Sequence, residues 1–397
     1  MSEWKEFKLG EIIEICSSKR IFYKEYVSIG IPFYRSKEII EKHNGKTIST
    51  DLFITQERFD ELKIKFGVPQ KGDILLTSVG TLGVPYIVQN EEFYFKDGNL
   101  TWFKNFNSNL DSLFLYYYLL SPRGKGELEM SAIGSTQPAL TISGLRELKL
   151  TLPPLPEQQA IAEVLSSLDD KIDLLHRQNQ TLEQMAETLF RQWFIEEAKE
   201  EWKLFKIKDI AIHKKDSVNP SKNPFGEYKH FSLPAFDSGK KPQVELGNTI
   251  HSNKYRVHKN SILVSKLNPR IPRIWLNLKH VDEMCICSTE FQVIHPNRID
   301  YLGFLFCLLK SDDAVAELEM SASGTSGSHQ RVRPEDILNL KFSTPSLERV
   351  QEFSQIIEPL LSKNDQNLRS IINLEKQRDT LLPKLMSGEV RVKIDKE

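Results

Sequence analysis

Two short segments carry hydrogen-bonding side chains at close spacing. Residues 77–83 (TSVGTLG) combine hydroxyl groups with glycine, and residues 265–273 (SKLNPRIPR) project cations and an amide from a loop stiffened by two prolines. Such groups distinguish base pairs in the major groove of DNA, and a stiff loop loses less entropy on binding. We therefore predict DNA contacts by Thr77, Ser78 and Thr81, joined by Tyr34, Arg35 and Gln137, and by Lys266, Asn268, Arg270 and Arg273, joined by His329, Arg331 and Arg333.

Positive charge is concentrated around the second of these loops. Between His251 and His280 the chain has no Asp or Glu. It has seven cationic residues there: Lys254, Arg256, Lys259, Lys266, Arg270, Arg273 and Lys279. Over residues 156–200 the balance is reversed, with an excess of acidic side chains. This distribution predicts a polyanion-binding surface near the second loop, with an ordinary solvated basic face as the alternative. The first loop lies in a segment that is not notably basic.

Catalytic motifs are missing from the sequence. It contains no GxxxxGK[ST] phosphate loop, no GxGxxG after a predicted strand and no HExxH pair. His329 lies near glycines and hydroxyl residues without a nucleophile partner, so we interpret it as a contact residue. Four cysteines at irregular spacing (Cys16, Cys285, Cys287 and Cys307) predict neither a disulfide framework nor a zinc site. We expect neither catalytic residues nor a metal site in this chain.

The sequence contains an internal repeat. The hexapeptide ELEMSA occurs at residues 127–132 and again at 317–322, an offset of 190. Residues 72–78 match 260–266, and residues 4–12 match 202–210, at offsets of 188 and 198. An offset of about half the chain predicts a tandem duplication, because solenoid repeats are only ~20–50 residues long.

Each half begins with a segment typical of an α+β domain. Short β-rich runs near residues 74–79, 86–88, 99–103 and 262–265 are separated by turn residues, and residues 113–120 and 302–310 are predicted to form short buried helices. We expect four parts: globular domains at 1–152 and 199–344, and helices at 153–198 and 345–390.

The segment from 153 to 198 predicts one long helix with a coiled-coil seam. It opens with prolines, which are tolerated in a first turn, and has no Pro or Gly from residue 157 onward. Residues spaced alternately by four and three form the seam: Ile161, Leu165, Leu168, Ile172, Leu175, Asn179, Leu182, Ala186, Leu189 and Trp193. Asn179 would be a buried amide that determines the register of the helix pair.

The predicted partner is the helix after Pro345. Pro359 is expected to kink it or to start a new segment, and Ser387 with Gly388 to end it. The order of head, helix, head, helix favours two globular heads separated by an antiparallel pair, and two core helices of an ordinary bundle are the alternative.

Length and composition limit the class of protein. The chain has 397 residues, 27% of them charged, and a net charge of −1, which excludes a uniformly basic coat protein. Its N-terminus is charged, and its apolar runs fall short of the ~18 residues that span a bilayer. We expect a cytoplasmic protein without membrane segments.

The sequence resembles the specificity subunits of type I restriction-modification enzymes over almost its whole length. Residues 153–165 (PPLPEQQAIAEVL), 169–173 (DDKID) and 186–194 (AETLFRQWF) are similar to the central conserved region of that family, and residues 381–390 (LLPKLMSGEV) to its closing motif. Gly72-Asp-Ile-Leu and Gly134-Ser-Thr-Gln-Pro fit its recognition domains. The second half departs from the pattern at Pro345-Ser-Leu-Glu-Arg and Asn260-Ser.

The resemblance implies a fold and a role. Two target-recognition domains would each recognise half of a bipartite double-stranded DNA target, and the helices would act as spacer and as docking surface for methyltransferase subunits. The chain would have no activity and no cofactor of its own, and S-adenosylmethionine, ATP and Mg²⁺ would be bound by the methyltransferase and restriction-translocase subunits. From the residues alone, a methyltransferase or nuclease with unrecognised motifs and a protein-binding coiled-coil scaffold remain as alternatives.

Overall fold

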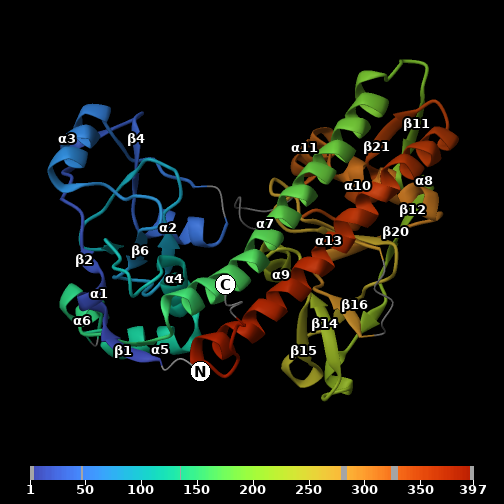
Figure 1. Cartoon of the computed structure of the whole chain (residues 1–397). Coiled ribbons are helices and arrows are strands. Elements are labelled where there is room, and N and C mark those ends of the chain that lie inside the picture. The colour runs from blue at the N-terminus through green and yellow to red at the C-terminus, as the bar shows by residue number, and fades with distance from the viewer. Residues whose placement is uncertain (1–3, 46–47, 135, 279–283, 323–329, 394–397) are drawn as a thin grey trace. The chain divides into compact units, whose positions relative to one another are not determined.

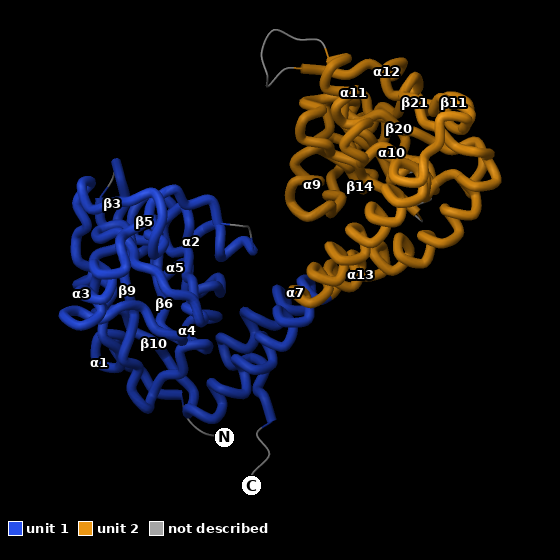
Figure 2. Tube along the Cα trace, turned by 90° about the horizontal axis from the view of Figure 1, so that it is seen from above, with its two compact units in different colours: residues 1–171, 374–397 blue, residues 172–373 orange. Residues whose placement is uncertain are grey.

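The structure is a computed structural model of the whole chain that describes residues 4–45, 48–134, 136–278, 284–322 and 330–393. The chain divides into two compact units (Figure 2). Unit 1 comprises Met1–Lys171 and Leu374–Glu397, and unit 2 comprises Ile172–Asn373. Each unit therefore combines one globular head with parts of both long helices.

The head of unit 1 contains three small sheets. Strands β1 (Lys5–Lys8) and β10 (Lys149–Leu152) pair antiparallel. A four-stranded antiparallel sheet has the order β2 (Glu14–Cys16), β9 (Leu100–Lys104), β6 (Ile74–Thr77) and β7 (Pro85–Ile87). The third has the order β3 (Tyr26–Val27), β5 (Phe53–Ile54), β4 (Ile31–Tyr34) and β8 (Tyr94–Phe95), and β4 and β8 are parallel. The helices are α1 (Leu9–Ile12), α2 (Ser36–His43), α3 (Gln56–Phe66), α4 (Ser112–Leu120), α5 (Pro122–Ser131) and α6 (Ile142–Arg146).

The head of unit 2 repeats this plan. Strands β11 (Lys203–Lys206) and β21 (Lys341–Thr344) pair, and a four-stranded sheet has the order β12 (Ala211–Lys214), β20 (Phe291–Pro296), β17 (Ser261–Ser265) and β18 (Ile274–Asn277). The third sheet has the order β13 (Ser217–Val218), β16 (Lys254–Arg256), β19 (Cys285–Cys287), β14 (Glu227–Phe231) and β15 (Gln243–Leu246). The helices are α8 (Ile207–Ile210), α9 (Leu233–Asp237), α10 (Leu302–Lys310), α11 (Asp312–Ser321) and α12 (Pro334–Asn339).

The matching strand orders confirm the predicted duplication. Strands β2, β9, β6 and β7 of unit 1 correspond in order to β12, β20, β17 and β18 of unit 2, and each head has one parallel strand pair in its third sheet. The predicted buried helices are α4 and α10, which are apolar on almost every side because both are enclosed by their heads.

Each head is followed in the sequence by a long helix (Figure 1). Helix α7 (Leu155–Arg191) continues into a π-helical turn at Gln192–Glu196, and α13 spans Leu347–Ser387. The predicted ends are confirmed, since α7 starts after Pro154 with Pro156 in its first turn, and Gly388 follows α13 with a φ of 76°. The prediction that Pro359 starts a new segment is wrong, because α13 runs through it.

The helices run antiparallel within each unit. In unit 1, Asp169 of α7 pairs with Arg378 of α13 at 2.8 Å, while the earlier Glu157 pairs with the later Arg391. In unit 2, Asn179 contacts Asn367, and later residues of α7 pack against earlier residues of α13. The predicted seam is confirmed, because each of its members is buried or half-buried in the structure.

Each unit has its own core to which the helices contribute. In unit 1, Ile161 and Leu165 of α7 join Leu382 and Leu385 of α13 against the head. In unit 2, Phe190 and Phe194 pack with Phe304 of α10 and Phe353 of α13. The predicted boundaries at 152/153 and 344/345 fall between a final strand and a long helix, at β10–α7 and β21–α13.

Candidate DNA interface

The first predicted contact loop connects β6 to β7 in unit 1 and is held by a second segment of the chain. Val79 forms a β-bridge with Ala139, and the amide of Leu140 donates to the carbonyl of Ser78 at 2.9 Å. The loop itself turns back where the amide of Gly83 donates to the Thr77 carbonyl at 2.8 Å. As a result, the loop after β6 and the described residues 133–134 and 136–139 form one surface.

Thr81 and Gln137 are both exposed on this surface. Gln137 follows Gly134, whose φ is 105°, and a Cβ on Gly134 would lie 3.0 Å from the Gln137 carbonyl oxygen. Only glycine fits there without strain. The predicted contacts of Thr81 and Gln137 therefore stay predictions, and the structure brings both onto adjacent segments.

Two hydroxyl residues of this loop are placed differently from the prediction. The side chains of Thr77 and Ser78 are buried, and Thr77 Oγ1 accepts from the amide of Val84 at 2.9 Å. Ser78 Oγ lies 2.6 Å from Thr101 Oγ1 on the neighbouring strand β9. The prediction that they contact bases is wrong for this structure, because a buried and satisfied hydroxyl has no surface to offer. They instead anchor the loop to the sheet.

Tyr34 and Arg35 are also placed differently from the prediction. Tyr34 is 4% exposed and stacks on Phe93 with ring centroids 4.4 Å apart, and burial raises the pKa of Tyr34 to about 12. Tyr34 is therefore a core residue and the predicted contact is wrong. Arg35 pairs with Glu38 at 2.8 Å and with Asp51 at 3.2 Å at the start of α2. The two carboxylates largely compensate the charge of Arg35, so its attraction to a DNA phosphate is weaker.

The second predicted loop connects β17 to β18 in unit 2 and has the same support. Leu267 forms a β-bridge with Arg331, and the amide of Val332 donates to the carbonyl of Lys266 at 2.9 Å. Asn268 has a φ of 52°, a left-handed conformation that asparagine tolerates well, and its amide donates to the Gln330 carbonyl. The two loops occupy equivalent positions on equivalent sheets.

The cations of the second loop are not equally available. Arg270 is exposed, as is Arg333. The guanidinium of Arg333 makes a long contact with Asp336, at 3.6 Å. In contrast, Arg273 makes two bonds to Asp237, at 2.8 and 3.0 Å, and Arg331, although exposed, pairs with Glu290 at 3.0 Å. The strongest candidates for DNA contact are therefore Arg270 and Arg333, with the half-exposed Lys266 and Asn268 beside them. His329 lies outside the described residues.

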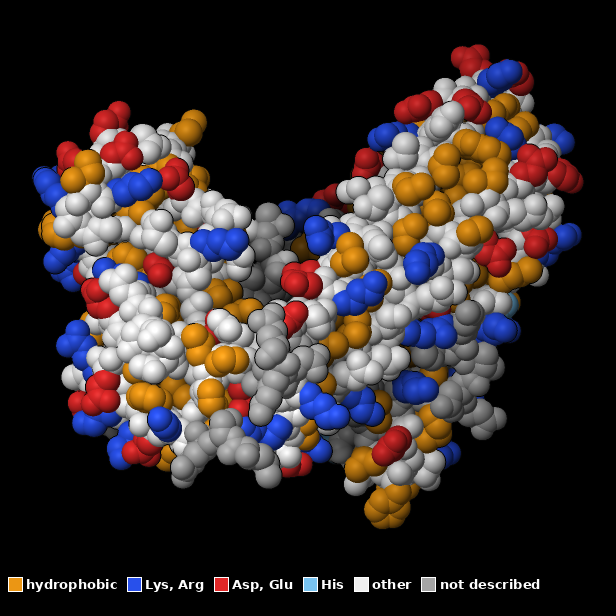
Figure 3. All heavy atoms as spheres, viewed as in Figure 1, with side chains coloured by type: hydrophobic (Ala, Val, Ile, Leu, Met, Phe, Trp, Pro, Cys, Tyr) orange, Lys and Arg blue, Asp and Glu red, His pale blue; other side chains and the backbone are white. Residues whose placement is uncertain are grey.

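The predicted basic surface is smaller than the run of cations in the sequence. Lys254 is buried on β16, where its Nζ lies 2.6 Å from Ser252 Oγ and burial lowers its pKa. Lys279 lies outside the described residues. On the face shown in Figure 3, Lys and Arg side chains gather over the part of unit 2 that holds α9, β14 and β15. Positive potential in unit 2 therefore extends beyond the loop itself.

Asn179, predicted to determine helix register, lies in a buried cluster of amides in unit 2. Its Oδ1 accepts from Asn367 Nδ2 at 2.9 Å, and its backbone carbonyl accepts from Asn364 Nδ2 at 3.3 Å. Asn364 of α13 is thus a partner of Asn179, although the two residues are 185 positions apart in the chain.

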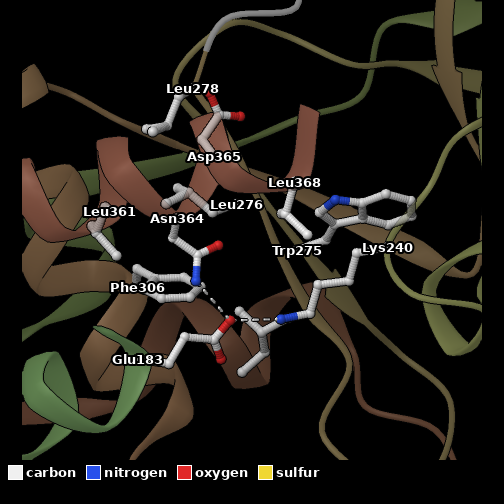
Figure 4. A pocket seen from close by; sticks show the side chains of 11 residues that line it. Glu183, Lys240, Trp275, Leu276, Leu278, Phe306, Leu361, Asn364, Asp365 and Leu368 are labelled. Atoms are coloured by element: carbon white, nitrogen blue, oxygen red, sulfur yellow. Dashed lines mark hydrogen bonds and ion pairs between the residues drawn. The ribbon is translucent and has the colours of Figure 1, made fainter. Parts of the chain in front are cut away.

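A charged cluster lies one turn further along α7 (Figure 4). Glu183 accepts from Lys240 at 2.9 Å and from Lys310 at 2.7 Å, and it approaches Asn364 at 3.4 Å. Burial alone would raise the pKa of Glu183, but the two lysines outweigh it and lower that pKa to about 2. This cluster joins α7 to α10 and to the turn after α9.

The described part of the chain shows no cluster of His, Cys, Asp or Glu placed to hold a metal ion. Within the same residues, no helix is both long and apolar enough to cross a bilayer. The described residues of the loops instead bring together hydroxyl, amide and guanidinium groups on rigid supports. Their chemistry is recognition by hydrogen bonding and charge.

Comparison with known proteins gives consistent results. The family described as "Type I restriction modification DNA specificity domain" matches residues 1–184 and 199–376. The MjaIX specificity subunit of Methanocaldococcus jannaschii is 27% identical over 98% of this chain and 94% of that protein. A putative type I specificity subunit of Haemophilus influenzae is 32% identical over 42% of this chain and 40% of that protein. The crystal structure of the type I restriction-modification S subunit from M. genitalium is similar, with a TM-score of 0.61 and 17% identity, covering 97% of this chain and 96% of that one.

Proposed function

This chain belongs to the DNA specificity subunits of type I restriction-modification systems and carries two target-recognition domains, and on that premise we propose how its residues recognise DNA. The head of unit 1 recognises one half of a bipartite target, and the head of unit 2 recognises the other half. Recognition uses the β6–β7 loop with residues 136–139 in unit 1, and the β17–β18 loop with residues 330–333 in unit 2.

One observation carries this proposal. Both heads hold the loop after a central strand by a β-bridge to a second segment, Val79 to Ala139 and Leu267 to Arg331. The scaffold is the same, yet the exposed side chains differ: Thr81 and Gln137 in unit 1, Arg270 and Arg333 in unit 2. Two domains that recognise different half-sites need equivalent rigid supports that carry different hydrogen-bonding groups.

We further propose that the chain has no catalytic activity of its own. The described residues contain no metal cluster, and the sequence lacks nucleotide and cofactor motifs. Methyltransferase subunits would bind S-adenosylmethionine, restriction subunits would bind ATP and Mg²⁺, and the long helices would serve as spacer and docking surface. The complex would act in the cytoplasm.

Replacing Arg270 tests the recognition proposal. We expect Arg270→Ala, assembled with methyltransferase subunits, to relax specificity at positions of one half-site, at a cost of about 1–3 kcal/mol in discrimination. The measurement is mapping of methylated bases on genomic DNA. Arg298→Ala is a matched control, because Arg298 is an exposed cation of the same unit that pairs with Asp300.

The outcomes separate the alternatives. A uniform loss of methylation across all sequences would make Arg270 a phosphate contact and not a base contact. Methylation by the chain alone with S-adenosylmethionine would show an enzyme and contradict the proposal. Failure of the chain to compete, in a salt-dependent way, for duplex DNA would instead favour a scaffold that binds only proteins.

A further inference from the structure

The repeated hexapeptide forms the last turns of equivalent helices, α5 in unit 1 and α11 in unit 2. Contacts within each head explain why some of its residues are the same in both copies. Leu128 and Leu318 are buried in their heads, and the hydroxyls of Ser131 and Ser321 donate to the carbonyls of those leucines at 2.9 and 3.0 Å. Packing and helix termination therefore account for the leucine and the serine.

The glutamate and methionine between them have no internal role of this kind. Met130 is 81% exposed and Met320 is 80% exposed, and Glu129 and Glu319 beside them are exposed too. A methionine side chain in water contributes nothing to the core, and folding alone would tolerate a polar residue there. The same exposed apolar group is nevertheless present in both heads.

The first halves of the two helices, in contrast, differ in sequence. Residues 122–126 are PRGKG in α5, whereas the equivalent residues 312–316 in α11 are DDAVA. The exposed Arg123 corresponds to the exposed Asp313, a reversal of charge. Exposed positions on these helices have therefore diverged freely, while the exposed positions of the last turn are identical.

The first glutamate of the hexapeptide is also identical in both heads without a shared contact that would explain it. Glu127 accepts from the hydroxyl of Tyr118 at 2.5 Å and from Arg123 at 3.1 Å. The equivalents of these two partners in unit 2 are Leu308 and Asp313, so Glu317 can make neither bond. Glu317 is exposed, and the glutamate has persisted although its contacts within the head have not.

The chemistry of this surface favours a protein partner over DNA. Half-sites of different sequence need different contacts, as the loops have, so an identical surface is not suited to base recognition. Its carboxylates repel phosphates. A flexible thioether flanked by carboxylates fits an apolar pocket edged with Lys or Arg, since methionine adapts readily to a partner surface.

From these observations we propose that the Glu-Met face is a docking surface for the methyltransferase subunit. This face is formed by Glu129 and Met130 in unit 1 and by Glu317, Glu319 and Met320 in unit 2. The inference rests on the proposed function, and it adds a contact outside the long helices. Because the face is present once in each head, it binds one copy of the same subunit at each.

The experiment uses the full chain with Met130→Gln, Met320→Gln and both together. Glutamine keeps the length, helix propensity and charge of the site but removes its apolar character. We expect each single variant to weaken one of the two methyltransferase-binding events by about tenfold, and the double variant to weaken both. Isothermal titration with the isolated methyltransferase subunit measures this. Binding of duplex DNA by the chain alone should not change.

Two exposed apolar residues outside this face provide matched controls. Ile64→Gln in unit 1 and Val244→Gln in unit 2 alter side chains that are 85% and 63% exposed, and both should bind like the wild type. Unchanged methyltransferase binding by the double variant would overturn the inference alone, and so would a selective loss of DNA binding. A wild-type chain that binds no methyltransferase subunit would refute the proposed function as well.

Discussion

The cluster of Asn179, Asn364 and Asn367 shows how single buried amides act in this protein. Asn179 Oδ1 is the acceptor for Asn367 Nδ2, and both residues are buried. An amide at a seam costs stability compared with leucine, and here Asn179 Nδ2 has no partner among the described residues, but the bond that Asn179 Oδ1 accepts forms only when the two helices are aligned. The cluster is therefore suited to selecting one register among those that an apolar seam allows.

A double-mutant cycle tests this role. We expect Asn179→Leu to destabilise the chain by about 1–3 kcal/mol, because Asn367 Nδ2 then loses its shorter bond and keeps only the one to Gln178 Oε1 at 3.3 Å. The double variant Asn179→Leu with Asn367→Leu should recover most of that loss. The free energy of unfolding in urea measures both. Additive losses in the double variant would show that the two amides do not act as a pair.

Glu183 predicts a dependence of stability on pH. Its folded pKa of about 2 lies below the ordinary value of 4.5, because Lys240 and Lys310 outweigh the effect of burial. Its stabilisation is therefore complete above pH 4.5 and is lost as the pH falls toward 2. We expect the urea midpoint of the wild type to fall more between pH 5 and pH 3 than that of Glu183→Gln.

The exposed Glu358 on α13 of the same unit is the control. Glu358→Gln should follow the wild type across this pH range. If the urea midpoint of Glu183→Gln also changes with pH as that of the wild type does, the cluster contributes no pH-dependent stability.

At the level of elements, the two helices pair with a constant register within each unit. Asp169 faces Arg378 in unit 1, and Asn179 faces Asn367 in unit 2. Residues 172–178 of α7 therefore correspond to residues 368–374 of α13. This correspondence defines one heptad in each helix. Removing both heptads keeps the pairs Asp169–Arg378 and Asn179–Asn367 and loses the longer bond from Asn367 Nδ2 to Gln178 Oε1.

Deleting both segments tests the spacer role of the helices. The deletion shortens each helix by about 10 Å, which equals the rise of about 3 base pairs of B-DNA. We expect the unrecognised spacer between the half-sites to shorten by that amount in methylation mapping. Inserting one heptad at the same place in both helices should lengthen it equally. A spacer of constant length in both variants would contradict the role.

At the level of the whole molecule, the C-terminal residues belong to the first unit. Leu382, Leu385 and Met386 pack with Ile161 and Leu165, and Arg391 pairs with Glu157 at the start of α7. The chain thus returns to unit 1 after completing unit 2. The stability of the N-terminal head is consequently linked to the last turns of α13.

A truncation after Asn373 tests this link. We expect hydrogen-exchange protection in residues 155–171 to fall by about tenfold or more, since the apolar face of α7 loses its partner. Helix α10 of unit 2 should keep its protection. A chain that ends at Val392 retains Arg391 and serves as the control. Equal loss of protection in both units would indicate that they do not unfold separately.

Sequence alone determined the features that depend on local pattern and on repetition. The 3-4 spacing from Ile161 to Trp193 predicted α7, the repeated motifs predicted the duplication, and Gly388 marked the end of α13. These signals lie within one segment, or repeat in order along the chain, so no three-dimensional information is needed to detect them. No new segment starts at Pro359, because a proline on an exposed helix face can be tolerated when the remaining face is packed.

Tertiary structure alone decided which side chains of the candidate interface are available. Thr77, Ser78 and Thr81 are all small hydroxyl residues of one loop, yet two are buried and one is exposed. The Thr77 hydroxyl accepts from Val84 at the other end of the loop, and the Ser78 hydroxyl bonds to Thr101 on strand β9. Likewise Asp237 and Glu290 engage Arg273 and Arg331 from distant parts of the chain. Exposure and ion pairing depend on which segments meet in space, and residue type together with spacing does not specify those meetings.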